Sequence, residues 1–336
     1  MRDLLSKLCT IPAVSGREDT IREFILSKIN GFCDAEVDKN GNIICFKKGK
    51  NTSAKKIMLD AHMDEVGIIV TGYTDDGFLK FSTVGGISSA VMNARRVIFE
   101  NGRIGVIGIK PVHLASADEK KKYPDADALY IDIGVDAKAE AEKIVSLGDT
   151  AVFEGGVSAT DDRVIARAID DRAGVAVLIK LLQNDSLYDF YATFTVQEEV
   201  GCRGAKNAAY SLDPDAAIVL EATTAADLDG VSEENKVCRL GSGPAVSFMD
   251  RSTLYDKRLY DAAINSGLKC QPKAAVAGGN NSGAVHLTRG GVPTLAVSVP
   301  CRYIHSPSCL ADFGDIEGMY SLAEYMLCKM ASGEIL

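Results

Sequence analysis

Hydrophobic residues recur with a helical period or in short extended runs at both ends of the chain, which predicts alternating helices and strands. Residues 15–30 join a capping-box pattern, Ser15-Gly-Arg-Glu18, to an amphipathic stretch, so we expect a helix there. The segment VDKNGNIICF predicts a hairpin that turns at Asn40-Gly41. Further on, RAGVAVLIKLLQN and DIEGMYSLAEYMLCKMAS have a helical period, whereas DFYATFTVQ, AAIVLEA and TLAVSVP are typical of strands. This alternation indicates an α/β fold.

The pattern changes between Gly67 and about Gly156, where short apolar runs such as GIIVTGY, FLKFSTV, RRVIFE and RIGVIGI are separated by turns. One helix, DAKAEAEKIV, interrupts them, and the charged stretch ADEKKKYPDAD predicts a solvated loop. We therefore expect an α/β domain, residues 1–66 and 160–336, with a central mixed sheet flanked by helices. A β-rich domain, residues 67–159, is inserted into it.

The amino-acid composition indicates which broad classes of protein the chain can belong to. The 336 residues are 46% hydrophobic and 25% charged, as in ordinary soluble globular proteins. A net charge of −9 argues against nucleic acid or an anionic membrane as the main partner, and no apolar run approaches the length of a membrane span. The start, MRDLLSKLCTIPAVSG, lacks the features of a secretory signal. Nine cysteines without a C-x-x-C pair fit reduced thiols, so we expect a cytoplasmic protein.

The candidate catalytic and metal-binding residues lie where the predicted strands end. Five motifs carry them: MLDAHMDEVG with His62 and Asp64, ARAIDDRAG with Asp170 and Asp171, FTVQEEVGCRG with Glu198 and Glu199, IVLEATTAADLDG with Glu221, and SVPCRYIHSPS with His305. Each has an ordinary structural interpretation when it is taken alone, such as a helix N-cap for the aspartates. Cys202 follows the glutamate pair without a histidine nearby, so we interpret it as a small core residue rather than a nucleophile.

The combination of motifs favours a metal site. In open α/β sheets, functional residues gather at the carboxyl edge of the strands. Histidines mixed with carboxylates suit Zn²⁺, Co²⁺ or Mn²⁺ better than Ca²⁺ or Mg²⁺, which prefer oxygen alone. One carboxylate can bridge two metals about 3.5–4 Å apart. A divalent cation would also explain why an apolar strand ends in two adjacent glutamates, one as a ligand and the other as a base.

The motifs AHMDEVG, AIDDRAG, TVQEEVGCRGA, LEATTA and RYIHSP resemble, in this order, the five sites of the co-catalytic metallo-aminopeptidases that assemble as tetrahedral particles. That family includes glutamyl, leucyl, lysyl and deblocking aminopeptidases, and some members were once labelled endoglucanases. The similarity runs over almost the whole chain. It implies a zinc-exopeptidase-like fold, two divalent metal ions and hydrolysis of N-terminal residues from peptides.

The resemblance also implies a role for each motif residue. His62, Asp170 and Glu221 would hold one metal, and Asp170, Glu199 and His305 the other, with Asp170 as the bridge, Glu198 as the general base and Asp64 as the partner that orients His62. It further implies that the β-rich insert is a dimerisation domain and that the chain forms homo-oligomers, from dimer to dodecamer. His113 and His286 are expected to be structural or surface residues.

The position of the insert separates this family from related carboxypeptidases and dipeptidases, which place a lid domain between the fourth and fifth ligand sites. Here Glu221 and His305 are only 84 residues apart, whereas His62 and Asp170 are 108 residues apart. The spare length of chain therefore lies between His62 and Asp170.

The alternative functions are a metallo-carboxypeptidase or deacylase of related fold, an endoglucanase, and a non-catalytic scaffold. Two carboxylates without a metal would suffice for a glycosidase, which would leave both histidines without a role.

Two positions depart from the family pattern. Relatives commonly have Asp where this chain has Glu221, and they commonly read Gly-Gly-Thr-Asp where this chain has Gly-Gly-Asn280-Asn281. The second change removes a negative charge. If the loop borders the substrate pocket, the change should weaken a preference for cationic residues.

Overall fold

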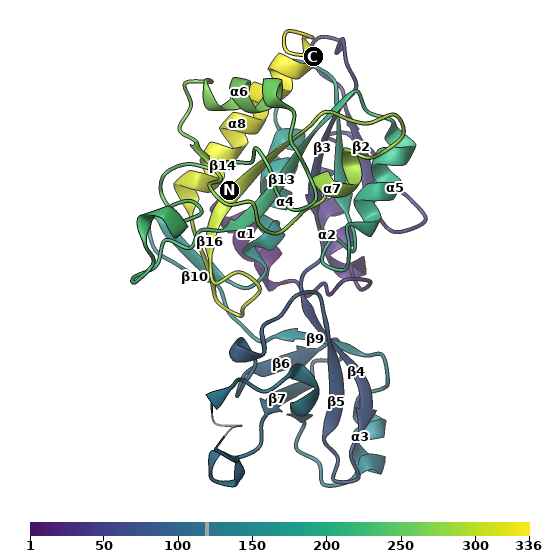
Figure 1. Cartoon of the computed structure of the whole chain (residues 1–336). Helices are drawn as coiled ribbons and strands as arrows, with labels where there is room; N and C mark the ends of the chain where they lie inside the picture. Colours follow the sequence, from purple (N-terminus) through teal and green to yellow (C-terminus); the bar gives the residue numbers. More distant parts are fainter. Residues whose placement is uncertain (118–120) are drawn as a thin grey trace.

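A long mixed β-sheet runs through the α/β part of the computed structural model, which describes residues 1–117 and 121–336 (Figure 1). In these residues eleven strands form the sheet, in the order β1-β2-β12-β3-β13-β16-β17-β11-β10, with β14 beside β16 and β15 beside β14. The central strands β12, β3, β13 and β16 run parallel, and β2 and β17 pair antiparallel with the outer two of them. The strands are β1 (Asp34–Val37), β2 (Ile43–Lys47), β3 (Ile57–His62), β10 (Ser158–Ala159), β11 (Arg163–Ala166), β12 (Phe190–Thr195), β13 (Ala216–Thr224), β14 (Ala245–Val246), β15 (Gln271–Pro272), β16 (Thr294–Arg302) and β17 (Cys309–Asp312).

Helices cover both faces of this sheet. The largest hydrophobic core lies under α1 (Arg2–Thr10), α2 (Asp19–Ile29), α4 (Ile169–Gln183) and α8 (Phe313–Ala331), and a smaller one under α5 (Arg203–Leu212) and α7 (Ser282–Val285). Helix α6 (Lys257–Ile264) packs against α8 and β14. Both faces of the central strands are therefore buried, which explains why β3, β13 and β16 are apolar with little alternation.

The segment between β3 and β10 forms a separate unit, drawn below the large sheet in Figure 1. Six of its described strands close into a barrel in the order β4-β5-β8-β7-β6-β9, around a hydrophobic core of their own. They are β4 (Gly67–Tyr73), β5 (Leu79–Val84), β6 (Arg96–Phe99), β7 (Ile104–Gly108), β8 (Tyr130–Asp132) and β9 (Thr150–Phe153), with helix α3 (Lys138–Ile144) beside them. A mixed α/β sheet with a β-rich unit is the predicted fold class, which is confirmed.

Several local predictions can be compared with the structure. The hairpin is confirmed, because β1 and β2 pair antiparallel up to Val37 and Ile43. The capping box is wrong: α2 begins at Asp19, and the Ser15 hydroxyl donates to Asp64 instead of capping the helix. Strand β13 does not end before Glu221 but continues through it to Thr224. Residues 118–120 of the charged stretch ADEKKKYPDAD lie outside the described residues.

Among residues 1–117 and 121–336, no helix combines the length and the apolar character needed to cross a membrane.

Candidate metal centre

The parallel strands bring the predicted site residues to one edge of the sheet. His62 is the last residue of β3, Glu198 and Glu199 follow β12, and His305 follows β16. Glu221 lies in β13 beside Ser298 of β16. Asp170 and Asp171 lie in the first turn of α4. A cavity of about 450 Å³ opens over this edge, and its walls include Asp170, Glu198, Glu199, Glu221 and His305.

The Asp170 carboxylate lies between the two histidines. Its Oδ1 is 3.3 Å from His62 Nε2, and its Oδ2 is 3.2 Å from His305 Nε2. His305 Nε2 is also 3.3 Å from Glu199 Oε1, and His62 Nε2 is 3.6 Å from Glu221 Oε2. One carboxylate therefore faces two separate imidazole–carboxylate pairs, which is the arrangement that a bridging ligand requires.

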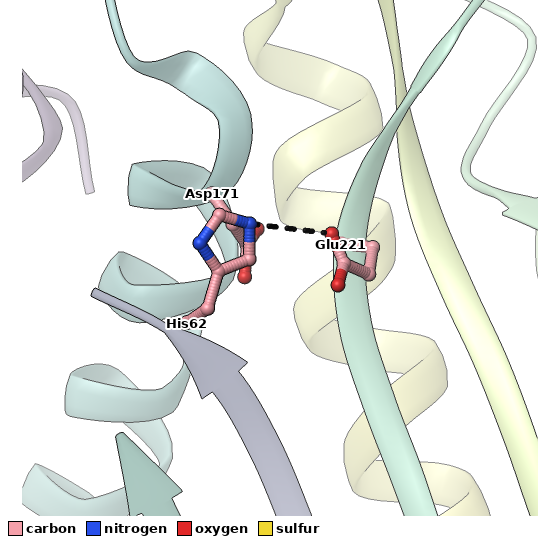
Figure 2. Close-up of side chains that lie close together, drawn as sticks. All are labelled: His62, Asp171 and Glu221. Atoms are coloured by element: carbon pink, nitrogen blue, oxygen red, sulfur yellow. Dashed lines mark ion pairs between the residues drawn. The ribbon is translucent and has the colours of Figure 1, made fainter. Parts of the chain in front are cut away.

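In the part of the chain that the structure describes, two groups of donor atoms are close enough to hold an ion. His62, Asp171 and Glu221 form one group, and His62, Asp170 and Glu199 form the other; in each, the donor atoms lie within 4.8 Å of one another. Figure 2 shows the first group, with His62 from β3, Asp171 from α4 and Glu221 from β13 turned toward one another. Asp171 was not among the predicted ligands, although its neighbour Asp170 was.

The first group contains buried oxygen atoms without a partner. Glu221 Oε1 and Asp171 Oδ2 are enclosed and accept no hydrogen bond from the described residues. The other Asp171 oxygen accepts from the Gly174 amide at 2.9 Å. An enclosed carboxylate oxygen without a donor is costly, and a divalent cation would satisfy it. The imidazole and carboxylate donors fit Zn²⁺, Co²⁺ or Mn²⁺, and the longer Glu221 side chain still reaches the group.

Both histidines are oriented by carbonyl groups. His62 Nδ1 lies 3.1 Å from the Asp64 carbonyl oxygen, and His305 Nδ1 lies 2.8 Å from the carbonyl oxygen of Gly86, just beyond β5. A carbonyl accepts only, so each Nδ1 carries the proton and donates. Each Nε2 is therefore turned toward the carboxylates, which is how metal-binding histidines are usually fixed.

The charges of the cluster are unbalanced without a cation. Burial raises the pKa of Glu221 well above its usual value. Burial disfavours a charge on His305, yet the carboxylates of Asp170 and Glu199 outweigh it and raise the pKa of this imidazole to about 11. Burial opposes the charge on His62 too, and Glu221 foremost raises its pKa well above the usual value. Each of these pKa shifts favours a bound proton in the metal-free site, and metal binding would release protons.

Asp64 holds the loop that carries the two glutamates. Its Oδ1 accepts from the Glu198 amide at 3.0 Å, and its Oδ2 accepts from the Glu199 amide at 3.2 Å. The Ser15 hydroxyl donates to the same carboxylate at 2.7 Å. Asp64 is fully buried, and its Oδ1 also lies 3.4 Å from His62 Nδ1. One carboxylate thus positions both a histidine and the glutamate pair.

Glu198 belongs to neither group of donor atoms, although it lines the same cavity. Burial raises its pKa to about 8 in the metal-free protein. Its Oε1 accepts from Cys202 Sγ at 3.5 Å. Cys202 is half-buried and lines the cavity, so the interpretation of Cys202 as a core residue was wrong. Burial also raises the pKa of the Cys202 thiol strongly, which makes this thiol a poor nucleophile.

The backbone around the site is strained. The non-glycine residues with φ between 53° and 59° include Ala168, Gln197, Cys202, Tyr303 and His305. Each left-handed residue of this kind costs about 1–3 kcal/mol, and such residues cluster where side-chain positions matter more than local stability. The strain at Gln197 and His305 is consistent with a preorganised site.

A cluster of buried ionic side chains lies beside the site. Glu65 accepts from Arg167 Nη1 with both oxygens at 2.8 Å, and from the Ala13 amide at 3.1 Å. Arg172, which is fully buried, lies 3.4 Å from Glu65 Oε1. These contacts tie the first turn of α4 to the segments beside β3.

We expect Glu65→Gln to destabilise the fold by about 3–5 kcal/mol, because two buried guanidinium groups would lose their carboxylate. Urea unfolding of the metal-free protein would show this as a lower midpoint. Glu36→Gln, at an exposed residue of β1, is the matched control and should change the midpoint little. Equal midpoints for both variants would contradict the structural role of Glu65.

The loop with Asn280 and Asn281 borders the cavity, but Asn281 itself does not face it. Gly278, Gly279 and Asn280 line the cavity, whereas Asn281 is fully buried and donates to Asp60 Oδ2 at 2.7 Å. The loop thus borders the cavity, as the hypothesis on substrate charge requires, and a weaker preference for cationic residues stays a prediction. An aspartate there would instead face the buried Asp60 carboxylate.

His286 fits its predicted structural role, since its Nδ1 donates to the Ser282 carbonyl at 2.8 Å.

Comparisons with known proteins show which family the chain resembles. The model of the M42 glutamyl aminopeptidase family matches residues 41–322. A putative aminopeptidase of Acetivibrio thermocellus is 41% identical over 98% of both chains. An aminopeptidase of the archaeon Desulfurococcus kamchatkensis has a solved structure that is 33% identical, with a TM-score of 0.92 over 99% of this chain and 96% of that chain. The TET1 peptidase of Pyrococcus horikoshii, described as assembling into a tetrahedron or a large octahedral shell, is 34% identical, with a TM-score of 0.83 over 96% of this chain and 98% of that one.

The predicted family resemblance is thus confirmed. A family model that covers most of the chain and relatives aligned from end to end point to the same class of hydrolase. The chain belongs to the M42 glutamyl aminopeptidase family.

Proposed function

We propose that this chain is a dinuclear-metal aminopeptidase that removes N-terminal residues from peptides, with Glu198 as the general base. The observation that carries the proposal is the Asp170 carboxylate, whose two oxygens face two different imidazoles. His62, Asp170, Glu199, Glu221 and His305 would hold two divalent cations, Zn²⁺ or Co²⁺ foremost and Mn²⁺ as a third choice. Asp171, which belongs to the first group and has one buried oxygen without a hydrogen-bond partner in the described residues, is an additional candidate ligand.

Two divalent cations would supply Lewis acidity, which lowers the pKa of the attacking water and polarises the scissile carbonyl. Glu198 lines the cavity outside both donor groups, so its carboxylate is free to accept the proton of that water and pass it to the leaving amine. Asp64 keeps this base in place through the Glu198 amide. The carboxylates of the cluster would also attract the protonated N-terminus of a peptide.

We assign 67–159 as a dimerisation domain inserted into a catalytic domain of residues 1–66 and 160–336. Its support is the closed barrel with a separate core, together with the shell that the related TET1 peptidase forms. We propose a homo-oligomer between dimer and dodecamer. All nine cysteines are free thiols, which supports a place in the reducing cytoplasm.

A screen of aminoacyl chromogenic amides with the metal-stripped protein, reconstituted in turn with Zn²⁺, Co²⁺ and Mn²⁺, tests the proposal. We expect hydrolysis only after reconstitution and renewed loss with a chelator. Peptides blocked at the amino end should resist cleavage, whereas peptides blocked at the carboxyl end should be cut. The reverse pattern would indicate a carboxypeptidase or deacylase, and chelator-resistant activity would contradict the metal mechanism.

A further inference from the structure

The inserted barrel reaches the candidate metal centre through one turn, Gly85-Gly86, which follows β5. Gly86 lines the cavity over the centre, and among the described residues that line this cavity it is the only one from the segment that forms the barrel. Gly67 of β4 pairs with Val84 of β5, directly before the turn. Because β4 begins shortly after His62, the last residue of β3, this pairing brings the turn to the end of β3.

The turn contacts two of the three residues of the proposed His305 site, which consists of Asp170, Glu199 and His305. The His305 Nδ1 donates to the Gly86 carbonyl at 2.8 Å. A methyl group built on Gly85 would lie 3.2 Å from Glu199 Cβ, so the main chain of the turn passes close to that side chain too. The barrel therefore contributes to the geometry of a site whose ligands come from the α/β part of the chain.

The acceptor that orients the other histidine belongs to the α/β part itself. His62 Nδ1 lies 3.1 Å from the Asp64 carbonyl oxygen, two residues further along the same segment. Asp171 and Glu221, which share a donor group with His62, lie in α4 and β13 beside the large sheet. The two imidazoles of the centre are thus fixed by different parts of the molecule.

The first position of the turn requires glycine. Gly85 has a φ of 82°, in the left-handed region that favours glycine. A methyl group there would lie only 2.8 Å from Val66 Cγ1, besides its approach to Glu199. An alanine would therefore push the turn away from these neighbours, and the Gly86 carbonyl, one residue further on, would move with it.

We infer that the Gly85-Gly86 turn is a positioning element for the His305 site, so that the placement of the barrel sets the affinity of one metal ion and not of the other. The inference rests on the proposed dinuclear function and adds a control of that centre by the inserted domain. An acceptor on Nδ1 keeps Nε2 of His305 directed at the ion and makes it a more basic ligand. A displacement of the barrel would remove this acceptor while His62 kept its own.

Gly85→Ala should raise the dissociation constant of one Co²⁺ ion about 10–100-fold, as the loss of such a partner of a ligand usually does, and leave that of the other ion unchanged. Titration of the metal-free protein with Co²⁺, followed by visible absorption and elemental analysis, measures both constants without reference to activity. The spectrum of the ion that Gly85→Ala retains should match that of His305→Ala, which lacks the ligand itself. This match identifies which ion is lost.

Gly102→Ala is the matched control, because Gly102 has nearly the same φ, 81°, in the turn between β6 and β7, and a methyl group there meets nothing within 4 Å. Gly86→Ala is a second control, since it keeps the carbonyl and places its methyl group 3.7 Å from His305 Nδ1, an ordinary contact. Both should bind two ions as the wild type does. The melting temperature of each metal-free variant shows whether it is folded.

One glycine inserted between Gly86 and Ile87 loosens the turn without adding a side chain, so it should weaken the same ion even if Gly85→Ala does not fold. Wild-type affinity for both ions in the folded turn variants would overturn the inference alone. Equal weakening of both ions, or loss of an ion from Gly102→Ala, would also overturn it, because the effect would then be general strain. A wild type that binds a single Co²⁺ ion would contradict the dinuclear function instead.

Discussion

Glu198→Gln should lose turnover by about 10²–10⁴-fold and keep its metal ions, because glutamine has the shape of glutamate but cannot accept a proton. The loss should appear in kcat, since the substitution affects proton transfer rather than substrate binding. Glu198 is outside both donor groups, so the variant should bind metals as the wild type does. Steady-state kinetics on an aminoacyl amide, with elemental analysis of the purified protein, measures both quantities.

Glu140→Gln, an exposed residue of α3, is the matched control for this experiment. It should retain wild-type kcat. Near-normal turnover in Glu198→Gln would remove Glu198 from the mechanism. Loss of metal together with activity would show that Glu198 is a ligand rather than a base.

Asp170→Asn should affect metal binding itself. The substitution removes a negative charge from a carboxylate that faces both His62 and His305. Since both proposed metals share Asp170, we expect the content to fall from two ions per chain to one or none. The activity should fall by more than the factor of about 10²–10⁴ expected for the general base.

The exposed Asp185→Asn provides the control, because Asp185 contacts only Lys50 among the ion pairs of the described residues. It should keep two ions per chain. A full metal content in Asp170→Asn would show that the two sites do not depend on a common carboxylate.

Much of the fold and of the candidate site could be predicted from the sequence, because the carboxyl ends of the parallel strands meet at one edge of the sheet. The apolar runs that end at His62, before Glu198 and before His305 indicated neighbouring parallel strands, whose carboxyl ends meet at one edge of a sheet. The order of the motifs along the chain then pointed to the family. The run of short predicted strands separated by turns also indicated a β-rich unit, and the structure has a closed barrel in this part of the chain.

The remaining features depend on local geometry or long-range contacts. Asp170 and Asp171 are adjacent, and which donor group each one enters depends on their non-helical backbone, with ψ values of 111° and 42°. Ser15 matched a capping pattern, but its partner Asp64 is 49 residues away. Asn281 follows residues that line the cavity, yet its side chain donates to Asp60, a contact across 221 residues that the sequence does not indicate.

The most direct test of the central claim is the crystal structure of the Zn²⁺- or Co²⁺-loaded protein, with anomalous scattering recorded at the absorption edge of the metal. We predict two peaks about 3.5–4 Å apart, one on each side of the Asp170 carboxylate. A single peak, or two peaks that do not share Asp170, would contradict the dinuclear centre.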